Sequence, residues 1–303
     1  LAITGNLVSR FVPKADAAAP ELKIHLNPIP ESWRVFALAR RQLAVRNAML
    51  GVSWFWFVGT ALTAQLPNYA ESHLGGDETL YLFALGVFSI GTGIGSLLCE
   101  KLSARTVEIG LVPLGAFGMS FFLFDLYFAR SGVASVAGLE IAGFLRQPGS
   151  WRVALDLFGV GMFAGFFLVP LFALIQSRTP KQELSRVISG VNIQNACFIV
   201  LAAVLGIVLQ MEQFTIGSTT IRMPGLGIPQ LFLCLAIANT LVAIWIFTIV
   251  PEFMMRFLSW MFVRALYRLQ LHGIEKNVPD EGPALIVCNH VSYMDALILS
   301  ASI

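Results

Sequence analysis

The sequence predicts an all-α polytopic membrane protein with six transmembrane helices, followed by the beginning of an α/β domain. Of the 303 residues, 56% are hydrophobic and only 13% are charged, and the mean hydropathy is +0.75. A soluble domain of this size does not need so much apolar surface, so the bilayer is the expected solvent for most of the chain. The composition changes after residue 252: an interfacial helix is predicted over 253–271, and the α/β domain is predicted to begin at residue 272.

Six apolar stretches account for the predicted spans. They cover residues 47–69, 79–99, 109–129, 153–176, 187–210 and 229–251. Each has about the 20 residues that a helix needs to cross roughly 30 Å of hydrocarbon. They lack the alternation of barrel strands, and backbone groups inside a bilayer must pair within their own segment, so helices are predicted. Residues 1–9 resemble the tail of an earlier span, so we expect the chain to be a piece of a longer protein.

The basic residues predict the orientation of the spans. If the connection 10–46 is cytoplasmic, sixteen Lys and Arg residues fall on the inner side and four on the outer side. The inner ones are Arg10, Lys14, Lys23, Arg34, Arg40, Arg41, Arg46, Lys101, Arg105, Arg178, Lys181, Arg186, Arg256, Arg264, Arg268 and Lys276; the outer ones are Arg130, Arg146, Arg152 and Arg222. Cytoplasmic loops are enriched in Lys and Arg, so the C-terminal segment is predicted to be cytoplasmic.

The segments on either side of the spans 47–252 have their own predicted structure. Within the linker 10–46, residues 11–30 are rich in Pro and Ala and are predicted to be irregular. Residues 31–47 predict a basic amphipathic helix that leads straight into the first span. Segment 253–271 carries a basic stripe of Arg256, Arg264 and Arg268 and predicts an interfacial helix, with the α/β domain beginning at 272–303.

Charge and cysteine content exclude several classes of function. The net charge is +2 and the basic residues are scattered over loops, so no nucleic-acid partner is expected. The four cysteines are far apart and lie in apolar runs without metal-ligand spacing. We therefore expect no metal site and no cofactor.

Acidic and amide residues inside the spans are candidates for a substrate path. Asp125 and Asp156 are costly in a bilayer and would normally face the bundle interior or a water path, although both lie near a span end, where an interfacial position is possible. Asn192, Gln194 and Asn195 fall in the middle of one span and could form interhelical hydrogen bonds or part of a polar path.

Two pairs of glycines, Gly91 with Gly95 and Gly161 with Gly165, have the spacing that lets helix backbones approach closely. Tight packing alone would explain them. Helices that slide during transport would also use such glycines, and the sequence leaves both interpretations open.

The loop between the second and third spans carries the charges Glu100, Lys101 and Arg105. This stretch, "GSLLCEKLSAR", resembles the inner-loop motif of the major facilitator superfamily, although the usual glycine between the charges is missing. The resemblance implies that these charges lock the cytoplasmic helix ends in one access state; an ordinary charged loop is the alternative. It also implies that the six spans are the C-terminal half of a twelve-helix carrier.

The motif "NHVSYMD" follows a predicted strand near the C-terminal end of the chain. A neutral imidazole at His290 could accept the proton of an alcohol that attacks a thioester, and a carboxylate at Asp295 could orient that ring. Alternatively, Ser292 and Asp295 could form only a capping box at a helix start, with His290 bonded to backbone.

A longer pattern favours the catalytic interpretation. Residues 273–299, "GIEKNVPDEGPALIVCNHVSYMDALIL", resemble the start of the glycerolipid acyltransferase family, with Lys276 inserted between Glu275 and Asn277. The resemblance implies that His290 is the general base and that Asp295 orients it. It also implies an acyl-carrier protein or acyl-CoA as donor, and motifs beyond residue 303, so that this stretch alone would be inactive.

Together the two resemblances match a bacterial arrangement in which a lysophospholipid transporter of the major facilitator type is fused to a 2-acylglycerophosphoethanolamine acyltransferase. They imply a multi-pass protein of the inner membrane that flips a lysophospholipid, expected to be lysophosphatidylethanolamine, and re-acylates its free hydroxyl. Membrane lipid would be a further partner. A carrier for an unrelated solute, or a helical anchor that does not transport, remains an alternative.

Overall fold

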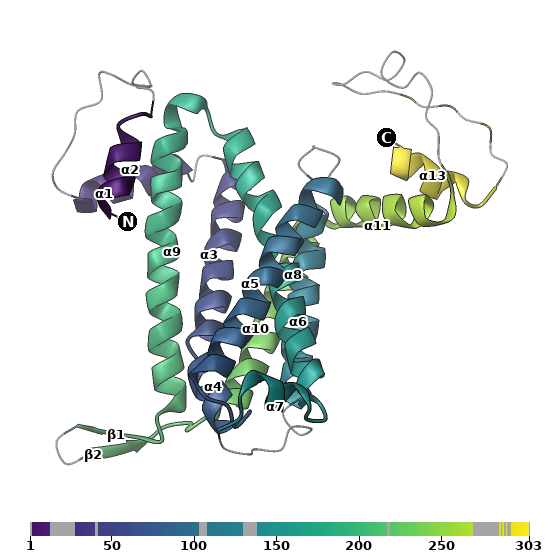
Figure 1. The fold of residues 1–303 in the computed structure, drawn as a ribbon. Helices are drawn as coiled ribbons and strands as arrows, with labels where there is room; N and C mark the ends of the chain where they lie inside the picture. Colours follow the sequence, from purple (N-terminus) through teal and green to yellow (C-terminus); the bar gives the residue numbers. More distant parts are fainter. Residues whose placement is uncertain are drawn as a thin grey trace.

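The computed structural model describes residues 2–12, 28–39, 42–102, 108–129, 138–216, 219–268, 285, 287, 289 and 292–302. Long helices run side by side as a bundle, and α11 projects sideways from one end of it (Figure 1). The bundle helices are α3 (Leu43–Thr63), α5 (Glu78–Leu102), α6 (Leu111–Ala129), α8 (Ser150–Arg178), α9 (Lys181–Gln210) and α10 (Ile228–Ile249).

Six membrane-spanning segments are confirmed by length and composition, with α3 continuing through a turn into α4 (Leu66–Ser72) to make the first. The segment α3–α4 and the helices α5, α8 and α9 extend beyond the apolar stretches that predict them, whereas α6 begins two residues later than its stretch and α10 ends two residues earlier. For example, α9 begins at Lys181, directly after Pro180, where the apolar stretch begins only at 187. Hydropathy marks the part of a helix that lies in hydrocarbon, whereas the helix itself continues until a capping or proline residue ends it.

Shorter elements lie at the bundle ends. They are α1 (Ala2–Ser9), α2 (Pro28–Ala39), α7 (Ile141–Leu145), α11 (Pro251–Leu266), α13 (Asp295–Ser302) and the antiparallel strands β1 (Gln213–Ile216) and β2 (Thr219–Arg222). The strands pair Gln213 with Arg222 and Ile216 with Thr219, in a connection for which the sequence predicts only an outer loop. The strand predicted at 284–288 lies mostly outside the described residues.

Helix α8 is the centre of the bundle, because it packs against α3, α5 and α6. Helix α9 packs mainly on α3 and α2, whereas α10 packs mainly on α6. The buried core between these helices includes Val52, Met119, Phe167 and Ala236. Two helices that are consecutive in the chain, α9 and α10, therefore have different principal partners.

The two predicted glycine pairs pack against the opposite helix of the same contact. A side chain at Gly91 or Gly95 of α5 would collide with backbone atoms of Phe158 or Met162 in α8. A side chain at Gly161 or Gly165 would collide with backbone of α5 in the same way. The predicted close approach is confirmed, and it occurs between these two helices.

The connections alternate between the two ends of the bundle (Figure 1). Helices α2 and α11 and the turn between α8 and α9 lie at one end, while α4, α7 and the β1–β2 hairpin lie at the other. The assignment of sixteen basic residues to one side and four to the other depends on this alternation. The end that carries α2 and α11 is called the basic end below.

The sequence predicts that residues 31–47 form one helix that continues into the first span, and this prediction is wrong. Helix α2 ends at Ala39, and α3 begins at Leu43 after Gln42 in an extended conformation. Val35 of α2 is buried against α9, where a side chain at Gly190 would collide with it. Helix α2 lies against α9, so it cannot also continue along the axis of α3. The helix is therefore interrupted between α2 and α3.

Helix α11 is amphipathic. Phe257 and Val263 are buried, and the N-terminal part of α11 lies against Gly110 at the start of α6. Met255, Phe262 and Leu266 are exposed, and Arg264 lies over the Trp260 ring at 5.0 Å. With 16 residues, α11 is shorter than the roughly 20 that a span requires.

Candidate functional site

Asp125 of α6 and Asp156 of α8 come together with Arg152 near the end of the bundle opposite the basic end. Arg152 donates from Nε to Asp125 Oδ2 at 3.0 Å and from Nη2 to Asp125 Oδ1 at 2.5 Å. Asp156 lies one helical turn beyond Arg152, is 1% exposed, and is within electrostatic reach of both partners. Neither carboxylate oxygen of Asp156 has a hydrogen-bond partner within the described part of the chain. The two predicted acids thus belong to one cluster.

The amides predicted in the fifth span occupy different environments. Asn192 is exposed, whereas Asn195 is buried against α3. With its nitrogen toward Ser53, Asn195 donates to Ser53 Oγ (2.8 Å) and the Val191 carbonyl (3.1 Å), and its oxygen accepts from Trp56 Nε1 (3.2 Å). This orientation of the amide satisfies all three contacts. Asn195 therefore joins α9 to α3 by hydrogen bonds.

Asn239 of α10 is a buried polar residue that the sequence analysis does not single out. Its Nδ2 donates to the Ala116 carbonyl and to Ser120 Oγ, both at 2.9 Å, and its Oδ1 accepts from Trp54 Nε1 at 2.9 Å. One side chain thus joins α10 to α6 and α3. An asparagine in the middle of an apolar span could have predicted a hydrogen bond between helices at this position.

The charges of the predicted conformational lock lie at the basic end. Glu100 and Lys101 are exposed in the last turn of α5. Arg105 lies outside the described residues. A contact among the three charges therefore stays a prediction.

At the opposite end, Asp77 caps the start of α5. Its Oδ1 accepts from the backbone N–H of Thr79 at 2.9 Å and from the Thr79 hydroxyl. The side-chain hydrogen bond from Thr79 holds the pKa of Asp77 below its ordinary value, since it stabilises the charged form. These bonds assign Asp77 to helix capping.

Near the C-terminal end, Ser292 and Asp295 form the cap of α13. Asp295 Oδ2 accepts from the Ser292 backbone N–H at 2.8 Å, and Ser292 Oγ accepts from the Met294 backbone N–H at 3.2 Å. One oxygen of Asp295 is thus fixed by the turn that connects it to the motif. His290 lies outside the described residues, so its distance to Asp295 stays a prediction.

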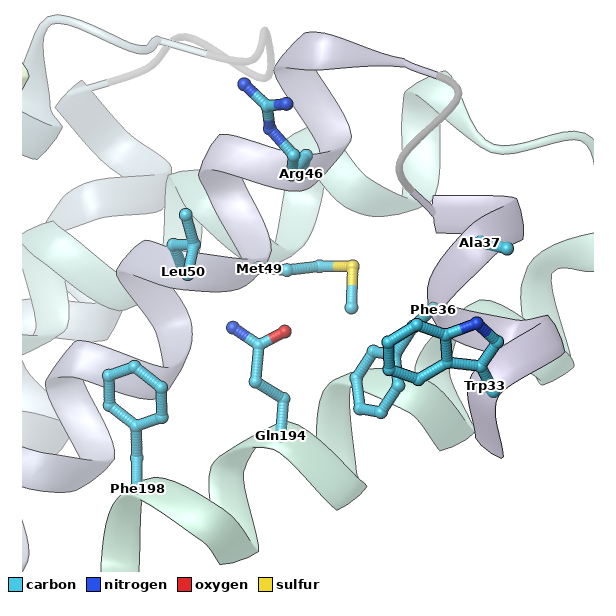
Figure 2. A pocket seen from close by; sticks show the side chains of 8 residues that line it. All are labelled: Trp33, Phe36, Ala37, Arg46, Met49, Leu50, Gln194 and Phe198. Carbon is cyan, nitrogen blue, oxygen red and sulfur yellow. The ribbon is translucent and has the colours of Figure 1, made fainter. Parts of the chain in front are cut away.

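Two cavities adjoin α9. One of about 600 Å³ lies between α2, α3 and α9, with an apolar wall that includes Trp33, Phe36, Met49 and Phe198 and the polar residues Arg46 and Gln194. Figure 2 shows Gln194 pointing into this cavity and Arg46 at its edge. A second of about 510 Å³ lies toward the other end, between α3, α4, α9 and α10. Both have the size and apolar lining of small-molecule sites.

Comparison with known proteins gives two separate likenesses. The family model described as Acyltransferase matches residues 268–303. A lysophospholipid transporter, LplT, from Citrobacter koseri is 26% identical over 185 residues, which is 60% of this chain and 42% of that protein. The transporter of the same name from Salmonella paratyphi B is 26% identical over 191 residues, 59% of this chain and 40% of that protein. No solved structure matches the chain.

The match therefore spans less than half the length of these relatives. The chain is similar to lysophospholipid transporters, and its C-terminal segment is similar to acyltransferases. Both resemblances that the sequence predicts are confirmed, and they occur in one multi-pass membrane protein.

Proposed function

We propose that the protein flips a lysophospholipid from the outer to the inner leaflet of a bacterial inner membrane and re-acylates it there. The observation that carries the proposal is the presence in one chain of both a likeness to lysophospholipid transporters and an acyltransferase segment. The expected lipid is lysophosphatidylethanolamine, and the expected acyl donor is an acyl-carrier protein or acyl-CoA. The six helices would be half of a twelve-helix major facilitator carrier.

The basic end of the bundle is the proposed cytoplasmic face. Helix α11 leaves the bundle at this end, and α13 packs on α11 (Figure 1). The exposed apolar residues Met255, Phe262 and Leu266 suit a helix that lies in the membrane interface. Acylation would then take place at the leaflet where the transported lipid arrives.

In the acyl transfer, His290 would accept the proton of the lysophospholipid hydroxyl as its oxygen attacks the thioester carbonyl. Asp295 would hold the ring in the required tautomer and stabilise the imidazolium that forms. The protonated ring would then return its proton to the leaving thiolate. The bond from Ser292 N–H to Asp295 supports this role, because it fixes the carboxylate relative to the motif.

Two assays on the whole protein test the two halves of the proposal. Acyl incorporation is measured in membranes, and uptake of labelled lysophospholipid is measured in cells. His290→Ala should lower acylation by about 10² to 10⁴-fold, because it removes the general base. Asp295→Asn should also be severe, since it loses the charge that favours imidazolium.

Ser292→Ala is the matched control. It removes the hydroxyl that accepts from Met294 N–H, should cost about 1 kcal/mol of helix capping, and should leave much of the activity. None of the three changes should alter uptake, because the motif lies outside the spans. Near-normal acylation by His290→Ala would reject the enzyme assignment. Absence of lysophospholipid uptake by the unchanged protein would favour a carrier for another solute or a helical anchor.

A further inference from the structure

We propose that the cavity between α2, α3 and α9 binds one lysophospholipid molecule at the basic end, with its phosphate at Arg46 and its acyl chain along the apolar wall. The identity of the lipid rests on the proposed function. The location of the site and the chemistry of its ligand rest on the cavity itself.

Aromatic side chains from α2 and α9 line opposite sides of the cavity. Helix α2 is held against α9, because Val35 is buried at Gly190. This contact places the α2 residues Trp33 and Phe36 on one side of the space, opposite Phe198 of α9 (Figure 2). Trp33 is 70% exposed even so. A large aromatic side chain left open beside an apolar cavity is typical of a surface that a ligand covers.

The cavity contains two polar groups, Arg46 and Gln194, that could bind a ligand. In the described part of the chain, neither the Arg46 guanidinium nor the Gln194 amide has a hydrogen bond or ion pair. Arg46 also lies near the N-terminal end of α3, whose first turn carries no acidic residue and whose N-cap residue Gln42 does not cap the helix with its side chain. A cation beside the positive end of a helix is unfavourable by itself, and a bound anion would stabilise both.

These features select an amphiphile with an anionic head. A guanidinium binds phosphate oxygens in pairs, and Gln194 can add an amide donor. The aromatic wall suits a hydrocarbon chain, and about 600 Å³ is within the range of sites for small ligands. A neutral polar solute would leave the apolar wall uncovered, and a cation would be repelled by Arg46. A single-chain phospholipid provides both complementary parts.

Tryptophan quenching can test the position of the acyl chain. The whole protein is placed in nanodiscs of unlabelled phospholipid, and lysophosphatidylethanolamine brominated on its acyl chain is added. Bromine quenches only nearby indoles, so part of the quenching should come from Trp33. Trp33→Phe should remove that part, whereas Trp151→Phe, which changes an exposed tryptophan near the other end of the bundle, should not. Quenching that is unchanged in Trp33→Phe would overturn the site. The proposal would also be wrong if another segment of the protein covers Trp33 and so occupies the place of the lipid.

Titration of the same probe tests the phosphate contact. Arg46→Gln should weaken its binding roughly 10-fold to 100-fold, the usual range for a lost charge-assisted bond. Arg178→Gln, which changes an exposed arginine that lines neither cavity, is the control and should bind normally. Brominated monoacylglycerol has no phosphate, so Arg46→Gln should leave its weaker binding unchanged. An equal loss for both lipids would show that Arg46 acts only on folding and would overturn the phosphate contact.

The outcome is separable from failure of the proposed function. If uptake and quenching by lysophosphatidylethanolamine are normal in both Arg46→Gln and Trp33→Phe, only the cavity proposal is wrong. If the unchanged protein neither takes up nor binds this lipid, the proposed function is wrong as well. Arg46→Lys keeps the charge but loses the paired donors, and intermediate binding by this variant would support the contact.

Discussion

Arg152 of α8 binds both carboxylate oxygens of Asp125 in α6, which joins the two helices near the end opposite the basic end. The same arginine lies one turn from Asp156, whose carboxylate is buried beside this pair. One cation thus lies beside two acids. It is hydrogen-bonded to Asp125, whereas Asp156 has no hydrogen-bond partner in the described part of the chain.

Loss of the arginine should destabilise the bundle. Arg152→Gln leaves Asp125 without its cation while Asp156 still lies beside it, and like charges in a partly buried site repel. Because the pair is partly exposed, we expect a cost on the order of 1 kcal/mol. The midpoint of thermal unfolding in detergent measures the change. Adding Asp125→Asn should restore part of the loss, and two additive costs would show that the residues are not coupled.

Asp156 is one of the two acids for which a role in the substrate path is predicted, and it is the more deeply buried of the two. If it faces the substrate path, Asp156→Asn in the whole protein should lower lysophospholipid uptake while expression stays normal, since a buried carboxylate can pair with the ammonium of an ethanolamine headgroup. Uptake of labelled lipid, corrected for protein amount, is the measurement. Unchanged uptake would assign Asp156 to the structure of the cluster alone.

The contact between α5 and α8 should not tolerate a side chain at Gly95. Gly95→Val would place atoms against the Met162 backbone, so the helices must separate, which typically costs about 1–3 kcal/mol. Gly93→Ala in the same helix is the matched control, because a side chain there meets nothing within 4 Å. Thermal stability should fall for Gly95→Val and stay equal or rise for Gly93→Ala. Equal effects would mean that helix propensity, not packing, decides the result.

The orientation can be tested with reporters. A reporter fused after residue 276 should report a cytoplasmic location, and one inserted near Arg222, in the hairpin at the other end, should report a periplasmic one. The prediction rests on sixteen basic residues against four and on the alternation of connections between the two ends. A periplasmic signal from the C-terminal fusion would reverse the topology and place the acyltransferase segment on the wrong side for a cytoplasmic acyl donor.

By itself the sequence determines the features that depend on local composition. Six apolar stretches are sufficient to predict six spans, because each backbone segment in hydrocarbon must satisfy its own hydrogen bonds as a helix. The spacing of Gly91 and Gly95 predicts a close helix contact for a similar reason, since spacing decides which residues share a helix face. The extended motif around His290 and Asp295 likewise predicts the acyltransferase segment, which the family comparison confirms.

Only the tertiary structure decides which residues meet across the bundle. Asp125 and Arg152 are 27 positions apart, and Ser53 and Asn195 are 142 apart, so no local pattern could pair them. The interruption between α2 and α3 depends on the packing of Val35 against Gly190 in α9. The cavity at Arg46 exists only because of that contact. Local sequence fixes the helices and their membrane exposure, whereas partners depend on how helix surfaces fit together, which is a property of the whole bundle.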